Sequence, residues 1–115
     1  MIEEGKSKGV WIMGQATLAV SERTAQHLAS LPVAGDNDHK LCALLVAEYR
    51  RRLSRYSLTD RLLREKYGLS FEEFERQKIT AQRNYSWEVE SDAVEWDLAI
   101  GGLQTMQRRL TELSE

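Results

Sequence analysis

The sequence is short of several features, and each shortage restricts what the chain can be. Its 115 residues include one cysteine and one proline, and no apolar run approaches transmembrane length. The single cysteine, Cys42, excludes an intrachain disulfide and fits a reducing, cytoplasmic location. The net charge is −2, so the chain as a whole lacks the basic excess typical of nucleic-acid-binding proteins. At the N-terminus acids precede a short apolar part, which is not the pattern of a signal peptide.

The residues that carry most enzyme chemistry are also scarce. His27 and His39 are far apart and have no cysteine or carboxylate at ligand spacing, so we predict no metal site. Cys42 has no histidine placed to activate it and is expected to pack as a small apolar side chain. No glycine-rich phosphate loop is found, because Gly101 and Gly102 fall inside a helical pattern. We therefore predict no catalytic residue, no cofactor and a protein that is not an enzyme.

One arrangement of carboxylates leaves a distant enzymatic alternative. Helical carboxylates one turn apart hold magnesium in all-helical nucleotide pyrophosphohydrolases. The acids of this chain that resemble them are Glu72, Glu73, Glu75, Asp92 and Glu95. Their spacing is imperfect, and such pairs arise in any acidic helix.

Charges of opposite sign occupy different parts of the chain. From Lys40 to Lys66 there are eight bases against three acids, whereas Tyr85 to Ile100 holds five acids and no base. Four of the bases, Arg50, Arg51, Arg52 and Arg55, follow one another closely on one predicted helix. Such a division indicates two different partners, or an internal contact in which the basic helix face receives the acidic segment.

The acidic segment is also aromatic. Residues 84–98 hold two of the three tryptophans and one tyrosine. Trp96 lies on the apolar stripe of a predicted helix and is expected to pack in the core or against a partner helix. Trp87 precedes that helix and is the better candidate to enter a partner's pocket, where tryptophan is enriched. The predicted partner-binding residues are Tyr85, Trp87, Glu88, Glu90, Asp92 and Glu95.

The N-terminal half predicts a strand followed by two helices. Alternation predicts a strand over residues 15–20, with Ala16, Leu18 and Val20 on its buried face. A helix over residues 22–31 is capped by Ser21 and ended by Pro32. After a polar turn, a long helix capped by Asn37 or Asp38 begins near His39. Its apolar stripe is Leu41, Leu44, Leu45, Tyr49, Leu53 and Tyr56.

The C-terminal half predicts only helices. The long helix either continues to a stop at Gly68 or restarts within residues 57–60. Ser70 and Glu73 form a capping box for a short helix over residues 71–77, and residues 79–86 are predicted to be irregular. A last helix covers residues 91–113, although the pair Gly101–Gly102 weakens it.

A short strand, a capped helix, a polar turn and a longer helix, as in residues 15–56, resemble the ribbon-helix-helix module. In that family two copies pair their strands into an antiparallel ribbon that enters the DNA major groove. The resemblance implies a mainly α fold with one short strand that pairs across a homodimer. It implies an N-terminal extension over residues 1–14, a dimerisation module over residues 15–57 and a helical partner-binding arm over residues 58–115.

The family is typical of antitoxins from bacterial type II toxin–antitoxin systems, in which a C-terminal tail wraps the toxin. Residues 66–75, 85–92 and 95–96 resemble such tails. The resemblance implies a cytoplasmic homodimer that neutralises a cognate toxin, binds operator DNA in addition and has no membrane partner. On the DNA side it implies contacts from Gln15, Thr17, Ala19, Asn37 and Lys40, although the ribbon carries no arginine or lysine. The alternative is an all-helical interaction or assembly protein that does not bind DNA.

Overall fold

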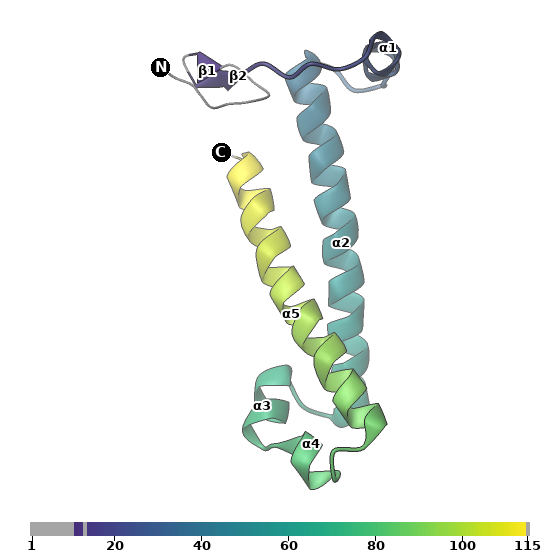
Figure 1. Cartoon of the computed structure of the whole chain (residues 1–115), viewed down its shortest axis with the longest axis vertical. Coiled ribbons are helices and arrows are strands. Elements are labelled where there is room, and N and C mark those ends of the chain that lie inside the picture. Colours follow the sequence, from purple (N-terminus) through teal and green to yellow (C-terminus); the bar gives the residue numbers. More distant parts are fainter. Residues whose placement is uncertain (1–10, 13, 115) are drawn as a thin grey trace. The chain divides into compact units, whose positions relative to one another are not determined.

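The computed structural model describes residues 11–12 and 14–114, and the chain divides into two compact units, residues 1–41 and 42–115. The elements, in chain order, are β1 (Trp11–Ile12), β2 (Gln15–Ala16), α1 (Glu22–Ala29), α2 (Asn37–Tyr67), α3 (Phe71–Arg76), α4 (Ile79–Gln82) and α5 (Trp87–Ser114) (Figure 1). The prediction of a mainly helical protein is therefore confirmed.

The first unit contains a very short β-hairpin. Strands β1 and β2 pair antiparallel, with Trp11 opposite Ala16 and Ile12 opposite Gln15. The predicted strand over residues 15–20 is wrong beyond Ala16, because β1 offers only two residues to pair with and residues 17–20 have no regular structure. Strand β2 thus has a partner within its own chain, whereas the sequence led us to expect one only from a second copy.

Local side-chain hydrogen bonds set the limits of α1 and the start of α2. Ser21 caps α1 as predicted, because its side chain accepts a hydrogen bond from the Thr24 amide at 3.2 Å. The helix ends at Ala29, two residues earlier than predicted, and the Lys40 ammonium donates to the Ala29 carbonyl at 2.9 Å. The cap of α2 is Asp36, whose carboxylate accepts from the His39 amide at 2.9 Å. The prediction that Asn37 or Asp38 caps this helix is therefore wrong.

In the second unit, α2 runs on without a restart at residues 57–60. It ends at Tyr67, and Gly68 stops it as predicted: the backbone there has a φ of +69°, and the Gly68 amide donates to the Arg64 carbonyl at 2.7 Å. Ser70 then caps α3, and its side chain accepts from the Glu73 amide at 3.2 Å. The prediction of an irregular segment over residues 79–86 is wrong for residues 79–82, which form α4.

An aromatic cluster forms the core of the second unit. Trp96 of α5 is 0% exposed, and its ring lies 5.2 Å from Phe74 and 6.0 Å from Tyr67, measured between ring centroids. The other buried members are Leu63, Ile79 and Val89, and Leu69, Phe71, Ala93 and Ile100 pack against them. Ile79 explains α4, because its burial in this cluster stabilises a single helical turn that the local sequence pattern does not predict.

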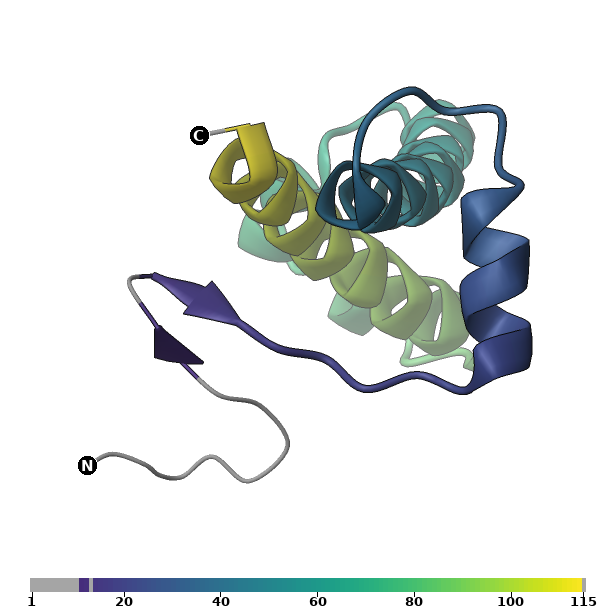
Figure 2. The same cartoon turned by 90° about the horizontal axis from the view of Figure 1, so that it is seen from above.

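Helices α2 and α5 lie side by side and antiparallel (Figures 1 and 2). From the core outward, the contacts are Lys66 with Asp92, Asp60 with Trp96, Tyr56 with Gly102, and Tyr49 with Arg109. Along this series the residue number falls in α2 and rises in α5, as an antiparallel pair of helices requires. The predicted stripe of α2 is buried only in part, since Leu44 and Leu45 remain exposed.

Candidate partner-binding surface on helix α5

Helix α5 begins earlier than predicted, and this changes the position of Trp87. Asn84 and Tyr85 adopt left-handed backbone conformations, with φ of 57° and 54°. Ser86 then caps the helix: its carbonyl accepts from the Glu90 amide at 2.9 Å and its hydroxyl from the Val89 amide at 3.4 Å. Trp87 is therefore the first residue of α5, and the prediction that it lies in a loop before the helix is wrong.

Three large apolar side chains of α5 face away from the core. Trp87, Val94 and Leu98 are 83%, 62% and 68% exposed. Because they are seven and four residues apart, they lie on one face of the helix. The opposite face carries the buried residues Val89 and Trp96. We call Trp87, Val94 and Leu98 the outer stripe.

The outer stripe borders a groove of about 690 Å³. Its lining consists of Thr80 from α4 and of Trp87, Glu90, Ser91, Ala93, Val94, Glu95 and Leu98 from α5. A second groove of about 390 Å³ shares Thr80 and Ala93 with it and is lined by Tyr85 as well. Four of the six predicted partner-binding residues, Tyr85, Trp87, Glu90 and Glu95, thus line two adjoining grooves.

Acidic side chains surround the outer stripe. Glu90 and Glu95 line its groove, and Asp97 is exposed on the same helix. The segment from Tyr85 to Ile100 contains no base. Among the residues that line the two grooves, Lys78 is the one base, and it belongs to the second groove. The surface therefore combines exposed apolar area with a negative rim.

Glu88 and Asp92, the other two predicted partner-binding residues, bind within the chain. The Lys66 ammonium of α2 donates to Glu88 Oε2 and to Asp92 Oδ2, both at 2.6 Å, and the Tyr67 hydroxyl donates to Asp92 Oδ2 at 2.6 Å. This is an internal contact between the basic and the acidic segment. It uses Lys66, whereas Arg51 and Arg52 pair with Glu48 and hold the pKa of that carboxyl down at about 2.

Ionisation states in this network follow from burial and hydrogen bonding. Burial opposes ionisation of Asp92, but the hydrogen bonds from Lys66 and Tyr67 outweigh it and keep the pKa below its usual value. Hydrogen bonds to Asp92 and Glu88 raise the pKa of Lys66. Burial, with the hydrogen bond to the Asp92 carboxylate, raises the pKa of Tyr67 to about 12. The carboxylate and the ammonium are thus both charged at neutral pH.

The Asp92 network predicts a pH dependence of stability. Because the folded-state pKa of Asp92 is lowered, its contribution is complete above the ordinary aspartate pKa of about 4 and is lost as pH falls through the folded value. We expect Asp92→Asn to lower stability at neutral pH and to reduce the further loss on acidification. Urea denaturation across this pH range measures both effects. Asp97→Asn, which removes an exposed acid of the same helix, is the control, and an equal change in the two variants would contradict the prediction.

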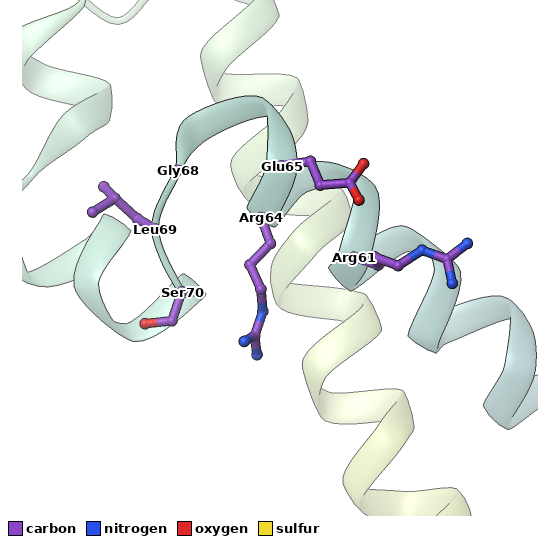
Figure 3. Close-up of a pocket in the computed structure, with 6 residues that line it drawn as sticks. All are labelled: Arg61, Arg64, Glu65, Gly68, Leu69 and Ser70. Atoms are coloured by element: carbon purple, nitrogen blue, oxygen red, sulfur yellow. The ribbon is translucent and has the colours of Figure 1, made fainter.

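The other candidate residues do not form a second site of comparable quality. A pocket of about 530 Å³ at the end of α2 is lined by Arg61, Arg64, Glu65, Gly68, Leu69 and Ser70 (Figure 3). The guanidinium groups of Arg61 and Arg64 point in different directions there, and Arg64 lies 3.3 Å from the Asp60 carboxylate. They do not converge on one anion.

The residues implicated in DNA contact lie in the first unit. Gln15 belongs to β2, Thr17 and Ala19 to the irregular segment that follows, and Asn37 is the first residue of α2. The first four of these five side chains are exposed. Lys40 is half-buried, and its ammonium donates to the carbonyl groups at the end of α1.

The carboxylates of the enzymatic alternative are partly engaged with bases. Glu73 pairs with Arg76, and Asp92 pairs with Lys66. Within residues 11–12 and 14–114, no group of three histidine, cysteine or carboxylate side chains is placed to hold a metal ion. In the same part of the chain, no helix has the length and apolarity needed to cross a membrane.

No protein-family model matches the chain, and no curated protein or solved structure matches it. The candidate surface is therefore judged on its geometry. Sequence reasoning missed five residues that line the groove beside the outer stripe: Thr80, Ser91, Ala93, Val94 and Leu98. The spacing of Trp87, Val94 and Leu98 could have identified Val94 and Leu98, because it places all three on one helix face. This inference is possible only when Trp87 is assigned to the helix.

Proposed function

We propose that this chain is an antitoxin-like protein that binds and neutralises a cognate protein through the outer stripe of α5. The observation that carries the proposal is Trp87, which is 83% exposed at the start of α5 beside a groove with an acidic rim. Because the backbone at Trp87 is already helical, binding need not order the main chain there, and tryptophan is among the residues that dominate binding energy.

The charge around the stripe specifies the partner's chemistry. Glu90 and Glu95 flank the groove, and the segment from Tyr85 to Ile100 holds five acids and no base. A partner with an apolar patch surrounded by arginine or lysine complements this surface. Opposite charges at the rim speed association more than they tighten the complex, so salt should slow the association step.

The ribbon-helix-helix dimer and operator binding form the finer part of the proposal. Exposed Gln15 and Thr17 support it, since both can reach base edges. An interaction protein without DNA binding is the second candidate, and the internal role of Lys40 favours it. Binding of the chain to its own upstream DNA at several salt concentrations separates the two. Steeply salt-dependent binding supports the operator role, and its absence supports the second candidate.

We expect Trp87→Ala to weaken partner binding without unfolding the chain. Loss of a hot-spot tryptophan costs about 2 kcal/mol or more, which is about a thirtyfold loss of affinity. Titration calorimetry with the product of the neighbouring gene measures this loss. Leu45→Ala, which truncates an exposed leucine of α2, is the matched control and should bind normally.

Deleting residues 84–115 is not a usable test of the same proposal. The deletion removes Trp96, Val89 and Ile100 from the core, so loss of binding would report only unfolding. The point variant avoids this problem. The proposal is wrong if Trp87→Ala binds with unchanged affinity, or if it unfolds the isolated chain.

A further inference from the structure

Helix α2 carries a second exposed apolar stripe. Leu44, Leu58 and Leu62 are 47%, 44% and 52% exposed. They are fourteen and four residues apart and therefore share one face of α2. Leu63 and Tyr67 lie on the other side of this helix, in the core of the same unit. We call Leu44, Leu58 and Leu62 the basic stripe, because basic side chains surround these leucines.

Positive charge surrounds the basic stripe. From Arg50 to Lys66 there are seven bases and two acids. Arg51 and Arg55 lie on the same face between Leu44 and Leu58, by the same helical spacing, and both are exposed. Glu48 pairs with Arg51 and Arg52, so one acid offsets two bases there. The apolar face of α2 is thus set among bases, as the outer stripe of α5 is set among acids.

From these two surfaces we infer that the chain associates with itself head to tail: the basic stripe of α2 in one copy docks on the outer stripe of α5 in the next. Both surfaces are exposed and apolar, and their charges are opposite. Docking therefore buries the apolar side chains and brings the acids of one copy to the bases of the other. This inference concerns the chain alone and does not depend on a cognate toxin.

The packing of α2 against α5 excludes the same contact within one copy. Helices α2 and α5 already pack against each other through Tyr56, Gly102, Asp60 and Trp96 (Figure 1). The residues of the two stripes are exposed and take no part in these contacts. Each copy therefore keeps one free surface of each kind, and a contact between unlike surfaces can repeat from copy to copy.

Pairing of two α5 helices would be less favourable. It would bring Glu90, Glu95 and Asp97 of each copy together without a base from Tyr85 to Ile100 to offset them. The proposed contact between α2 of one copy and α5 of the next involves only two helices, so its interface is small for a protein complex. We therefore expect association that is reversible, that increases with protein concentration and that salt weakens.

Sedimentation velocity of the full chain, together with two double variants, tests the inference. Leu58→Gln/Leu62→Gln removes the basic stripe, and Val94→Gln/Leu98→Gln removes part of the outer stripe; glutamine is a good helix former and all four positions are exposed. The wild type should form a series of species that grows with concentration. Each variant alone should stay at the smallest species. An equimolar mixture of the two should form a complex, because each supplies the surface that the other lacks.

The mixture distinguishes this contact from any symmetric one. If the same stripe paired with itself, mixing the two variants would not restore association. A mixture that stays at the smallest species, or a variant that associates as the wild type does, overturns the inference. Circular dichroism of each variant confirms that it is folded.

A charge reversal adds an independent control. Arg55→Glu places an acid within the basic stripe, whereas Arg76→Glu makes the same change of net charge on α3. We expect Arg55→Glu to reduce association at least tenfold and Arg76→Glu to leave it near the wild-type level, a difference of about 1.4 kcal/mol. Equal effects would show that net charge alone controls association and would also overturn the inference.

Discussion

Trp96→Ala is expected to unfold most of the second unit. The Trp96 side chain is 0% exposed and contacts Tyr67, Phe71 and Phe74 in the core. Its indole N–H also donates to the Asp60 carboxylate at 2.9 Å. Truncating a buried tryptophan costs about 3–5 kcal/mol, which is a large share of the about 5–15 kcal/mol that stabilises a typical domain.

Urea denaturation followed by circular dichroism measures this loss, and Trp87→Ala is its matched control. Trp87 is 83% exposed, so its truncation should change the free energy of unfolding by no more than about 0.5 kcal/mol. The same substitution in one helix therefore gives a structural effect at one tryptophan and a binding effect at the other. Comparable losses of stability in the two variants would mean that Trp87 is also part of the core.

The elements that sequence predicted correctly are those with local chemical signals. Ser21 and Ser70 cap α1 and α3 with their side chains, and Gly68 ends α2 in a left-handed conformation. Each signal acts within one helical turn, so the residues around it are sufficient to read it. The uninterrupted course of α2 through residues 57–60 is different, because the pattern fitted both a continuation and a restart.

The elements that sequence missed depend on distant residues. Helix α4 is four residues long and is stabilised by the burial of Ile79 against α3 and α5, which no local pattern shows. The strand partner of β2 was missed because β1 has only two residues, too few for an alternating pattern. The cap of α2 was placed one or two residues late, at Asn37 or Asp38 and not at Asp36, because three Asx-type residues in a row all fit the position.

The acidic segment was recognised from the sequence, but its division among faces was not. Because the sequence predicted the start of α5 at residue 91, Trp87 could not be assigned to any face of the helix. With the start at Trp87, the helix directs Trp96 into the core, Asp92 towards Lys66 and Trp87 outward. One stretch of chain thus supplies core, internal ion pair and exposed surface. Periodicity alone placed Trp96 on the apolar stripe but left open whether that stripe packs in the core or against a partner helix.

Gly101→Ala and Gly102→Ala should have opposite effects on stability. Nothing lies within 4 Å of the position of a Cβ atom at Gly101. Alanine there should stabilise α5 by about 0.5–1 kcal/mol, because glycine loses more backbone freedom in a helix. At Gly102 the added Cβ would lie 2.4 Å from Cε2 of Tyr56, so the Tyr56 ring would have to shift or α2 and α5 would have to move apart. Overpacking of this kind costs about 1–3 kcal/mol.

Thermal denaturation of the two variants measures both effects, and a double-mutant cycle tests the cause. In a Tyr56→Ala background the ring that blocks the Cβ is absent, so Gly102→Ala should no longer destabilise the chain. If it destabilises the Tyr56→Ala chain as much as the wild type, the close approach of α2 and α5 is not the reason for glycine at this position. If the cycle behaves as expected, Gly102 is the residue that lets the Tyr56 ring of α2 pack closely against α5.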